Sequence, residues 1–361
     1  MRTRVMAMAT LLTILSFACR NMSKKVIKEQ VSSEQALTIP RHLPPSCPLP
    51  KTCTEDQPVF PEPLGFKSLR NMAIAKIGAY SHRGRDIIAL PGKPLWIIGK
   101  FTYSYIDANL TDEPVDIYIS EGCSKGWQKI AQTKTTHSKE HETVENVADD
   151  GGRIFVELTS LGVNLPIGRH KILLVVPADN SYAEMYVDVV DPGTPFVITD
   201  VDGTLTSSEW AAATEAWAQI PEAHPNAAET FQQFYNKGYH IIYMTARADW
   251  FIYRTRLWLN KKGFPPGTLR TTSSQLGFNG IAASLFKTSE LALLKTNTGI
   301  IPSFAFGNKP SDVEAYGKAG ISPTSSYYFG LTDTDPLGGT IHSDYGALTK
   351  TFSSLPSICT P

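Results

Sequence analysis

The chain has 361 residues, with 34 Lys and Arg against 34 Asp and Glu, 42% hydrophobic residues and five cysteines. Its length exceeds what one hydrophobic core usually supports, so we expect two domains. The apolar and aromatic content excludes a chain that is disordered as a whole, and the zero net charge argues against a non-specific nucleic-acid binder, which needs an excess of basic residues.

Residues 1–19 have the pattern of an export signal. Arg2 and Arg4 precede an apolar stretch that ends at Ala18 and is shorter than a membrane span. Cleavage before Cys19 would leave a thiol on the first residue, as in bacterial lipoproteins, where that thiol carries lipid. We therefore expect an exported bacterial protein, anchored by lipid at Cys19 in the cell envelope, in the periplasm or at the outer membrane. A plain secretory signal and an uncleaved anchor are the alternatives.

Four cysteines remain beyond the signal. They are Cys47, Cys53, Cys123 and Cys359. An even number in an exported protein predicts up to two disulfides, and three pairings are open. Free thiols and a metal site are the rival interpretations, but no CxxC pattern or neighbouring pair of histidines supports a metal.

Residues 20–68 are predicted to form a tether, because eight prolines between Pro40 and Pro63 disfavour helix and central strand. Residues 69–192 then show short segments rich in β-branched and aromatic residues. These segments are 96–103, 115–120, 153–158, 171–176 and 184–190. Their spacing predicts an immunoglobulin-like β-sandwich. Between two of them, the stretch with His137 and His141 is interpreted as a solvated loop rather than a metal site.

Residues 193–335 change to an α/β pattern. Strands are expected at 196–199, 240–244, 303–306 and 326–329, with helices at 227–236, 250–262, 285–295 and 312–319. This alternation predicts a parallel sheet covered by helices, with ligands bound beyond the carboxyl ends of the strands. Residues 336–361 are expected to form an irregular tail.

Three motifs directly follow predicted strands, and a lysine lies between the last two. The residues concerned are Asp200, Asp202, Gly203 and Thr204 after the first strand, Thr245 and Arg247 after the second, Lys287, and Asn308 and Asp312 after the third. Two carboxylates separated by one residue repel each other unless a cation lies between them. An Asp that is paired with a metal ion is a competent nucleophile toward phosphorus. Alone, each motif is as well explained by a turn, a calcium loop, a helix cap or a surface lysine. Together and in order, they indicate phosphoryl chemistry.

This set of motifs, DxDGT, Thr, Lys and GNxxxD, resembles the haloacid-dehalogenase (HAD) superfamily of phosphohydrolases. More narrowly, residues 195–330 resemble the lipin-type (LNS2) phosphatidate phosphatase domain in the segments FVITDVDGTLT, HPNAAETF, YMTARADW, GFPPGTLR, FKTSELALL and FAFGNKPSDVEAY. The spacing around Asp249, Arg254 and Phe264 is similar to the C-terminal domain of membrane-associated phosphatidylinositol transfer proteins. The resemblance implies a Rossmann-like HAD domain with a parallel sheet, preceded by an immunoglobulin-like β-sandwich.

The resemblance also implies a role for each motif residue. Asp200 would attack phosphorus and form an aspartyl-phosphate, and Asp202 would protonate the leaving alcohol and then activate water. The phosphoryl oxygens would be held by Gly203, Thr204, Thr245, Arg247 and Lys287. A Mg²⁺ ion would be bound by Asp200, the main-chain carbonyl of Asp202 and Asn308, with Asp312 as a ligand or as support. Every candidate ligand is a hard oxygen, which favours Mg²⁺ over zinc.

The sequence departs from the lipin pattern in one place: the helix after the Thr motif lacks the usual Gly and Asp, and Trp250 and Tyr253 occupy that region. The transfer-protein branch often loses its catalytic aspartates, whereas Asp200 and Asp202 are both present. The intervals from Asp200 to Thr245 and on to Lys287 leave no room for a large cap domain. An open site favours a bulky or membrane-embedded ester.

We therefore expect a monomeric, Mg²⁺-dependent phosphatase that acts on phosphatidic acid, or a similar phosphomonoester, at a membrane surface, with no nucleic-acid partner. Two alternatives stay open: a phosphatase of soluble phosphate esters, and a phosphatidic-acid-binding module without turnover.

Overall fold

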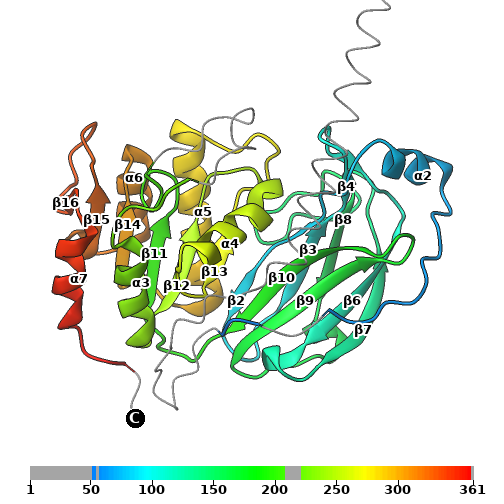
Figure 1. Ribbon diagram of the computed structural model, residues 1–361, viewed down its shortest axis with the longest axis horizontal. Coiled ribbons are helices and arrows are strands. Elements are labelled where there is room, and N and C mark those ends of the chain that lie inside the picture. The colour runs from blue at the N-terminus through cyan, green and yellow to red at the C-terminus, as the bar shows by residue number, and fades with distance from the viewer. Residues whose placement is uncertain (1–50, 54–56, 208–220, 359–361) are drawn as a thin grey trace, which may run out of the picture.

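The computed structural model describes residues 51–53, 57–207 and 221–358. They form a β-sandwich and an α/β block that lie side by side (Figure 1). The predicted fold class, a β-sandwich followed by an α/β domain with a parallel sheet, is confirmed.

The sandwich is built from two sheets. The larger has the order β2-β10-β9-β6-β7, with β2 (Ile87–Ala89), β10 (Ser181–Val189), β9 (Gly168–Val176), β6 (Pro114–Ser120) and β7 (Trp127–Lys134). The smaller has the order β1-β3-β8, with β1 (Arg83–Gly84), β3 (Trp96–Lys100) and β8 (Arg153–Glu157), and a separate pair joins β4 (Thr102–Tyr103) to β5 (Ala108–Asn109). All pairings are antiparallel except β2 with β10.

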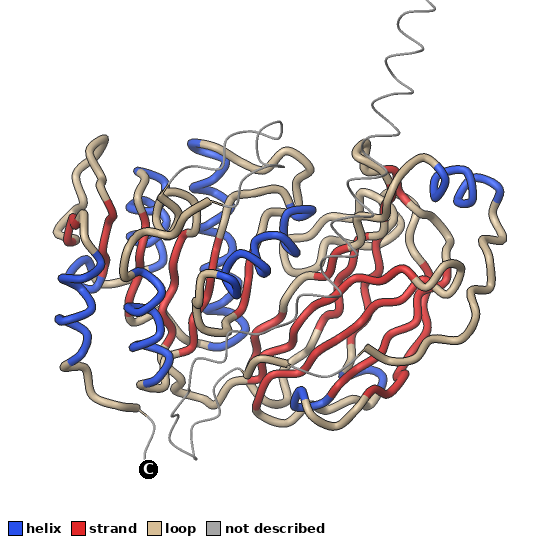
Figure 2. The backbone as a smooth tube through the Cα atoms, viewed as in Figure 1, coloured by secondary structure: helices blue, strands red, loops and turns tan. Residues whose placement is uncertain are grey.

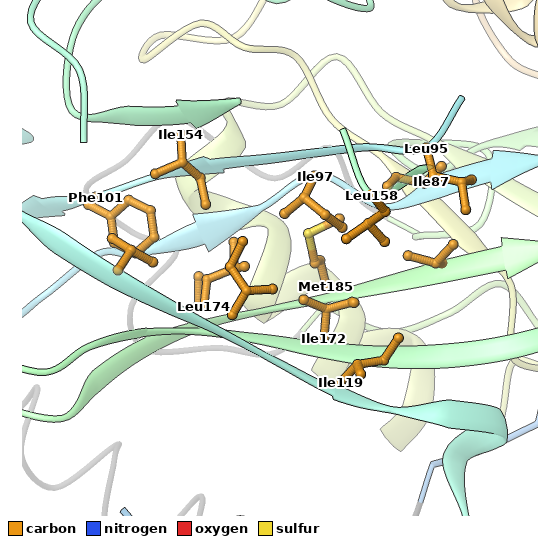
Figure 3. Close-up of a cluster of buried hydrophobic side chains, with 14 of the residues drawn as sticks. Ile87, Leu95, Ile97, Phe101, Ile119, Ile154, Leu158, Ile172, Leu174 and Met185 are labelled. Carbon is orange, nitrogen blue, oxygen red and sulfur yellow. The ribbon is translucent and has the colours of Figure 1, made fainter. Parts of the chain in front are cut away.

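Alternating apolar residues of the two sheets meet in one core. Ile172 and Leu174 of β9 face Ile97 and Ile154 of the opposite sheet, and these side chains interdigitate (Figure 3). Gly99 lies where the sheets approach closely, since a Cβ there would stand 2.7 Å from Leu174 Cδ1. A larger residue at position 99 would push the sheets apart.

Part of the predicted tether packs against the sandwich instead of extending from it. The Leu64 N–H donates to the Pro177 carbonyl at 2.9 Å, and the Asn180 side-chain amide donates to the Pro61 carbonyl at 2.7 Å. Prolines lack an N–H but keep their carbonyls, so an extended Pro-rich segment can still accept such bonds. The segment leads into α2 (Leu69–Lys76).

A disulfide joins Cys53 to Cys123, with the two Cα atoms 4.8 Å apart. It ties the segment that precedes α2 to the larger sheet of the sandwich. The other cysteines of the predicted framework, Cys47 and Cys359, lie outside the described residues, as does Cys19.

The α/β block has a six-stranded parallel sheet of order β13-β12-β11-β14-β15-β16. The strands are β11 (Phe196–Asp200), β12 (His240–Met244), β13 (Thr268–Arg270), β14 (Phe304–Gly307), β15 (Ser326–Phe329) and β16 (Thr340–His342). The helices are α3 (Ala227–Asn236), α4 (Ile252–Lys261), α5 (Gly280–Thr298), α6 (Pro310–Ala319) and α7 (Tyr345–Ser353). Two 3-10 turns of the described residues, η3 (Asp249–Phe251) and η4 (Pro323–Ser325), precede α4 and β15. Figure 2 shows the helices and strands of both blocks.

Both faces of this sheet are covered by helices, which explains why its central strands β11 and β12 are buried along their whole length. Val197 of β11 packs in a core with Phe231 and Phe234 of α3, whereas its neighbour Ile198 packs in a second core with Leu291 of α5. Successive side chains of a strand point to opposite faces. The strand β11 is therefore fixed at the centre of the sheet, and its carboxyl end is Asp200.

The C-terminal region differs from the predicted irregular tail, because it contains β16 and α7. The helix is not evident from the sequence because YGALTKTFS contains Gly, Ser and two Thr, which have low helix propensity. Tyr345, Leu348 and Phe352 share one face, and all three are buried. The ring of Phe352 lies 4.5 Å from that of Phe234, so packing against α3 stabilises the helix.

Buried ion pairs connect the sandwich to the α/β block. Asp86, which is fully buried, accepts from Arg256 of α4 at 2.7 Å. Arg169 and Asp188 of the sandwich form a two-bond ion pair at 2.7 and 2.8 Å, and the Thr268 hydroxyl of β13 donates to Asp188 at 2.7 Å. Since Asp86 and Asp188 each accept a bond from the α/β block, these buried contacts hold the two blocks in one arrangement.

Candidate active site

The turn after β11 carries the two aspartates. Gly203 adopts a positive φ of 74°, a conformation that favours glycine, and a Cβ at this position would collide with the side-chain amide of Asn308. The loops that follow β11 and β14 therefore come into direct contact. The motifs predicted to converge at the carboxyl edge of the sheet do so in the structure.

Asp200 is buried and bonded to a lysine. Lys287 Nζ donates to Asp200 Oδ1 at 2.6 Å and to Asp312 Oδ1 at 2.5 Å. Burial raises the pKa of Asp200 to about 7; Lys287 opposes this shift, and the neighbouring carboxylates Asp312 and Asp202 add to it. Burial also disfavours the Lys287 ammonium, but the two carboxylates outweigh it and hold the Lys287 pKa above its usual range. The site thus contains a fixed positive charge next to a carboxylate that is costly to ionise.

Asp202 is held by the loop that follows β12. The Thr245 hydroxyl donates to Asp202 Oδ2 at 2.7 Å, and Arg247 Nε donates to Asp202 Oδ1 at 2.8 Å. Arg247 also donates to the Thr255 hydroxyl at 3.0 Å. Sequence reasoning assigned Thr245 and Arg247 to phosphate oxygens; in this structure they contact a carboxylate, a group with the same charge sign and similar oxygen geometry.

Thr204 connects the nucleophile candidate to Asn308. Its hydroxyl lies 3.1 Å from Asp200 Oδ2 and 3.2 Å from Asn308 Oδ1. A hydroxyl has one proton, so it can donate to only one of these oxygens at a time. Asp200 Oδ2 and Asn308 Oδ1 therefore both lie next to the Thr204 hydroxyl, and each keeps lone pairs that can bind a cation.

This donor set fits Mg²⁺, since carboxylate, amide and main-chain oxygens are hard ligands. In the described part of the chain, no group of three or more His, Cys, Asp or Glu is placed to hold a metal ion. A cation at this site would therefore depend on Asn308 Oδ1 and on the main-chain carbonyl of Asp202 as well as on Asp200.

The contacts of Asp312 favour support over ligation. Its Oδ2 accepts the N–H groups of Asn308 and Lys309, both at 3.0 Å, at the start of α6. Its Oδ1 accepts from Lys287, so both oxygens are engaged within the protein. Asp312 thus fixes the loop that carries Asn308 and orients Lys287.

Two residues near the catalytic turn were not singled out from the sequence. His224 Nε2 lies 3.3 Å from the Gly203 carbonyl, and the Tyr345 hydroxyl donates to the Thr204 carbonyl at 2.9 Å. His224 opens the HPNAAETF segment, so a signal for it was present in the sequence. Tyr345 lies in the region expected to be irregular, and no local pattern indicated it.

Solved structures similar to this chain include phosphatases. One is the cobalt-bound deoxy-D-mannose-octulosonate 8-phosphate phosphatase from Haemophilus influenzae, at 17% identity and a TM-score of 0.31, covering 45% of this chain and 88% of that one. Another is D,D-heptose 1.7-bisphosphate phosphatase from B. bronchiseptica, complexed with magnesium and phosphate, at 12% identity and a TM-score of 0.30, covering 44% of this chain and 98% of that one.

Curated relatives are membrane-associated phosphatidylinositol transfer protein 1 of Rattus norvegicus, 26% identical over 275 residues, and protein retinal degeneration B of Drosophila melanogaster, 25% identical over 278 residues. Each match covers 76% of this chain and 20% of the relative, so the chain spans about a fifth of the length of these relatives.

These relatives overturn one prediction. The expectation of an exported, lipid-anchored protein of the bacterial cell envelope is wrong, because the matching proteins come from rat, human and fruit fly. A short apolar segment behind two arginines is too common a pattern to identify a bacterial lipoprotein. Within the described ranges, no helix is long and apolar enough to cross a membrane.

Family models match both blocks of the structure. Residues 80–189 match the beta-sandwich domain of PITM 1-3, and residues 197–330 match the LNS2 domain of PITM 1-3. The LNS2 match covers the three strand-end motifs and Lys287. The chain therefore carries a beta-sandwich domain of the PITM 1-3 type followed by an LNS2 domain of the same type.

Proposed function

We propose that this chain is a Mg²⁺-dependent phosphatase that hydrolyses a lipid phosphomonoester, phosphatidic acid or a close analogue. The observation that carries the proposal is the arrangement around Asp200. This buried carboxylate lies at the end of the central strand, 2.6 Å from the ammonium of Lys287, and Asp202 is held beside it.

In the proposed reaction, a carboxylate oxygen of Asp200 attacks phosphorus, and the bond from phosphorus to the lipid oxygen breaks. Asp202 gives its proton to the departing oxygen, which leaves as an alcohol. Asp202 then accepts a proton from a water molecule, whose oxygen attacks phosphorus and releases inorganic phosphate from Asp200. Lys287 stays protonated throughout and offsets the negative charge that Asp200 and the phosphoryl group bring together.

Mg²⁺ would be held by Asp200, Asn308 and the main-chain carbonyl of Asp202. When bound, the ion supplies positive charge that lowers the repulsion between the phosphate group and the two aspartates. Thr204 would orient the ligand oxygens, since its hydroxyl contacts both Asp200 and Asn308.

An apolar surface beside the site supports a lipid substrate. The segment Ser273–Phe286 has no charged residue and leads directly to Lys287. Within it Leu276, Ile281 and Leu285 are 95%, 80% and 59% exposed. The helix α5 (Gly280–Thr298) begins at the end of the sheet where β11 ends (Figure 1), and its Lys287 bonds to Asp200, so the first turns of α5 lie beside the site. Exposed apolar patches of this kind mark contacts with membranes or partners. The relatives are named as membrane-associated proteins, which agrees with that reading.

The test measures phosphate release by the purified chain with Mg²⁺, on phosphatidic acid in mixed micelles and on a soluble aryl phosphate. We expect turnover on phosphatidic acid and its loss in Asp200→Asn. The matched control is Asp191→Asn, which removes an exposed carboxylate from the segment that links the two blocks.

Faster turnover of the soluble ester would replace the lipid substrate by a soluble one. Binding to vesicles that contain phosphatidic acid, without turnover of either substrate, would overturn the enzyme proposal in favour of a lipid-binding module.

A further inference from the structure

The helix α7 lies beyond the residues that match the LNS2 domain, which end at residue 330, yet it reaches the catalytic turn. Tyr345 is its first residue and is fully buried. The Tyr345 hydroxyl donates to the main-chain carbonyl of Thr204 at 2.9 Å. That carbonyl belongs to the turn that carries Asp200 and Asp202.

A second ring contacts the neighbouring carbonyl of the same turn. His224 Nε2 lies 3.3 Å from the Gly203 carbonyl, and because a carbonyl only accepts, this nitrogen is the donor. The ring of Phe329 contacts both donors: it stacks on His224 with centroids 3.7 Å apart and on Tyr345 with centroids 5.6 Å apart, and the His224 and Tyr345 rings are themselves 6.3 Å apart. Two successive carbonyls of the turn are thus bonded by two members of one cluster of rings.

The turn satisfies other groups internally but not these carbonyls. The N–H groups of Leu205 and Thr206 both donate to the Val201 carbonyl, at 3.0 and 3.2 Å. The Gly203 N–H donates to the Thr206 hydroxyl at 2.9 Å. The peptide group after Thr204 is therefore held from two sides, by the Leu205 N–H bond inside the turn and by the Tyr345 hydroxyl from outside it.

Tyr345 is itself held firmly against α3. The buried Thr230 hydroxyl lies 3.2 Å from the Tyr345 carbonyl and 2.6 Å from the Thr349 hydroxyl. At the other end of α7, Lys237 donates to the Ser353 carbonyl at 3.0 Å. Figure 1 shows α7 and α3 side by side at one end of the sheet.

We propose that Tyr345 is a positioning residue for the catalytic turn, acting on Asp200 through Thr204. By fixing the Thr204 peptide, it directs the Thr204 side chain to its place between Asp200 Oδ2 and Asn308 Oδ1. The C-terminal helix is then part of the catalytic unit, although the LNS2 match ends before it. The expected change in kcat rests on the proposed phosphatase activity, whereas the expected loosening of the turn rests on the geometry alone.

The test compares Tyr345→Phe with Tyr243→Phe. Tyr243 is equally buried, and its hydroxyl donates to the Pro265 carbonyl at 2.8 Å, away from the turn. Each variant removes one buried hydrogen bond to a carbonyl, so both should lower Tm by similar amounts. We expect kcat for phosphate release to fall roughly tenfold in Tyr345→Phe alone, with KM nearly unchanged, because an orienting contact and no substrate contact is lost.

Hydrogen exchange of the Leu205 and Thr206 amides gives a second readout that needs no activity. These amides should exchange faster in Tyr345→Phe and at the wild-type rate in Tyr243→Phe. Equal kcat and equal exchange in the two variants would overturn the positioning role. If the wild type releases no phosphate, the proposed function fails, and the exchange rates alone decide whether Tyr345 holds the turn.

Discussion

Replacing the candidate nucleophile Asp200 by asparagine should stabilise the protein while it abolishes turnover. The pKa of Asp200 is raised from 3.8 to about 7, chiefly because the carboxyl is buried. An amide resembles the protonated carboxyl in size and charge, so Asp200→Asn removes the cost of keeping a buried group ionised. Active sites often carry such a cost, because the group that reacts is held in an unfavourable environment.

The magnitude follows from the two pKa values. A group whose pKa is raised on folding binds its proton more tightly in the folded state, so wild-type stability falls as pH rises from the unfolded value of 3.8 toward about 7. Above that range the ionised carboxylate costs about 4 kcal/mol relative to a neutral group, taking about 1.4 kcal/mol for each pH unit. The asparagine variant has no such dependence, so its advantage should be near zero at pH 4 and largest at pH 8.

Urea unfolding in EDTA at several pH values measures this difference. EDTA removes divalent cations, which would otherwise stabilise the carboxylate in the wild type only. The exposed control Asp191→Asn should show no pH-dependent advantage. If Asp200→Asn is no more stable than the wild type at pH 8, or if its advantage does not grow with pH, the reasoning about a costly buried charge is refuted.

Three further predictions concern other parts of the molecule. Burial lowers the pKa of His240 to about 4, so the unfolded chain takes up a proton that the folded chain refuses. Stability should therefore fall by about 3 kcal/mol between pH 6.5 and pH 4, and His240→Asn should flatten this slope in urea titrations. Replacing Leu276 and Ile281 by Asp should reduce co-sedimentation with phosphatidic-acid vesicles at least tenfold, since charge then meets the bilayer; unchanged binding would exclude this surface. The disulfide closes a loop with a sequence separation of 70, so Cys53→Ser should lower the free energy of unfolding in oxidising buffer by about 4 kcal/mol. Reduction of the disulfide in the wild-type protein should lower the free energy of unfolding by the same amount.

The convergence of the site was predictable because of the sheet. Asp200, Thr245 and Asn308 each follow a predicted strand, and the carboxyl ends of parallel strands meet at one edge. Their individual contacts were not predictable, because they depend on side-chain rotations that no spacing records. Thr245 thus contacts Asp202, although sequence reasoning assigned it to phosphate.

The missed helix α7 has a different cause. Its sequence is a weak helix former, and its buried face has a partner only when α3 and the sheet are in place. The same holds for β7, whose residues are mostly partly exposed and lack a strong apolar alternation. Where an element is stabilised mainly by tertiary packing, the local sequence pattern predicts a loop instead.

The charges in the site suggest how substrate binding and acid–base chemistry are connected. Lys287 already bonds to Asp200 and Asp312, so its donors are largely used within the protein. Arg247 is a second cation near Asp200 and Asp202, and its Nε bonds to Asp202 at 2.8 Å. A phosphate dianion that arrives at Asp200 competes with Asp202 for that guanidinium, because Arg binds both groups through the same pair of donors. Release of Asp202 from Arg247 then frees the Asp202 carboxyl to turn toward the departing oxygen. Arg247→Lys, with a point charge in place of the planar fork, should therefore reduce kcat as well as raise KM, whereas a residue that only binds phosphate would change KM alone.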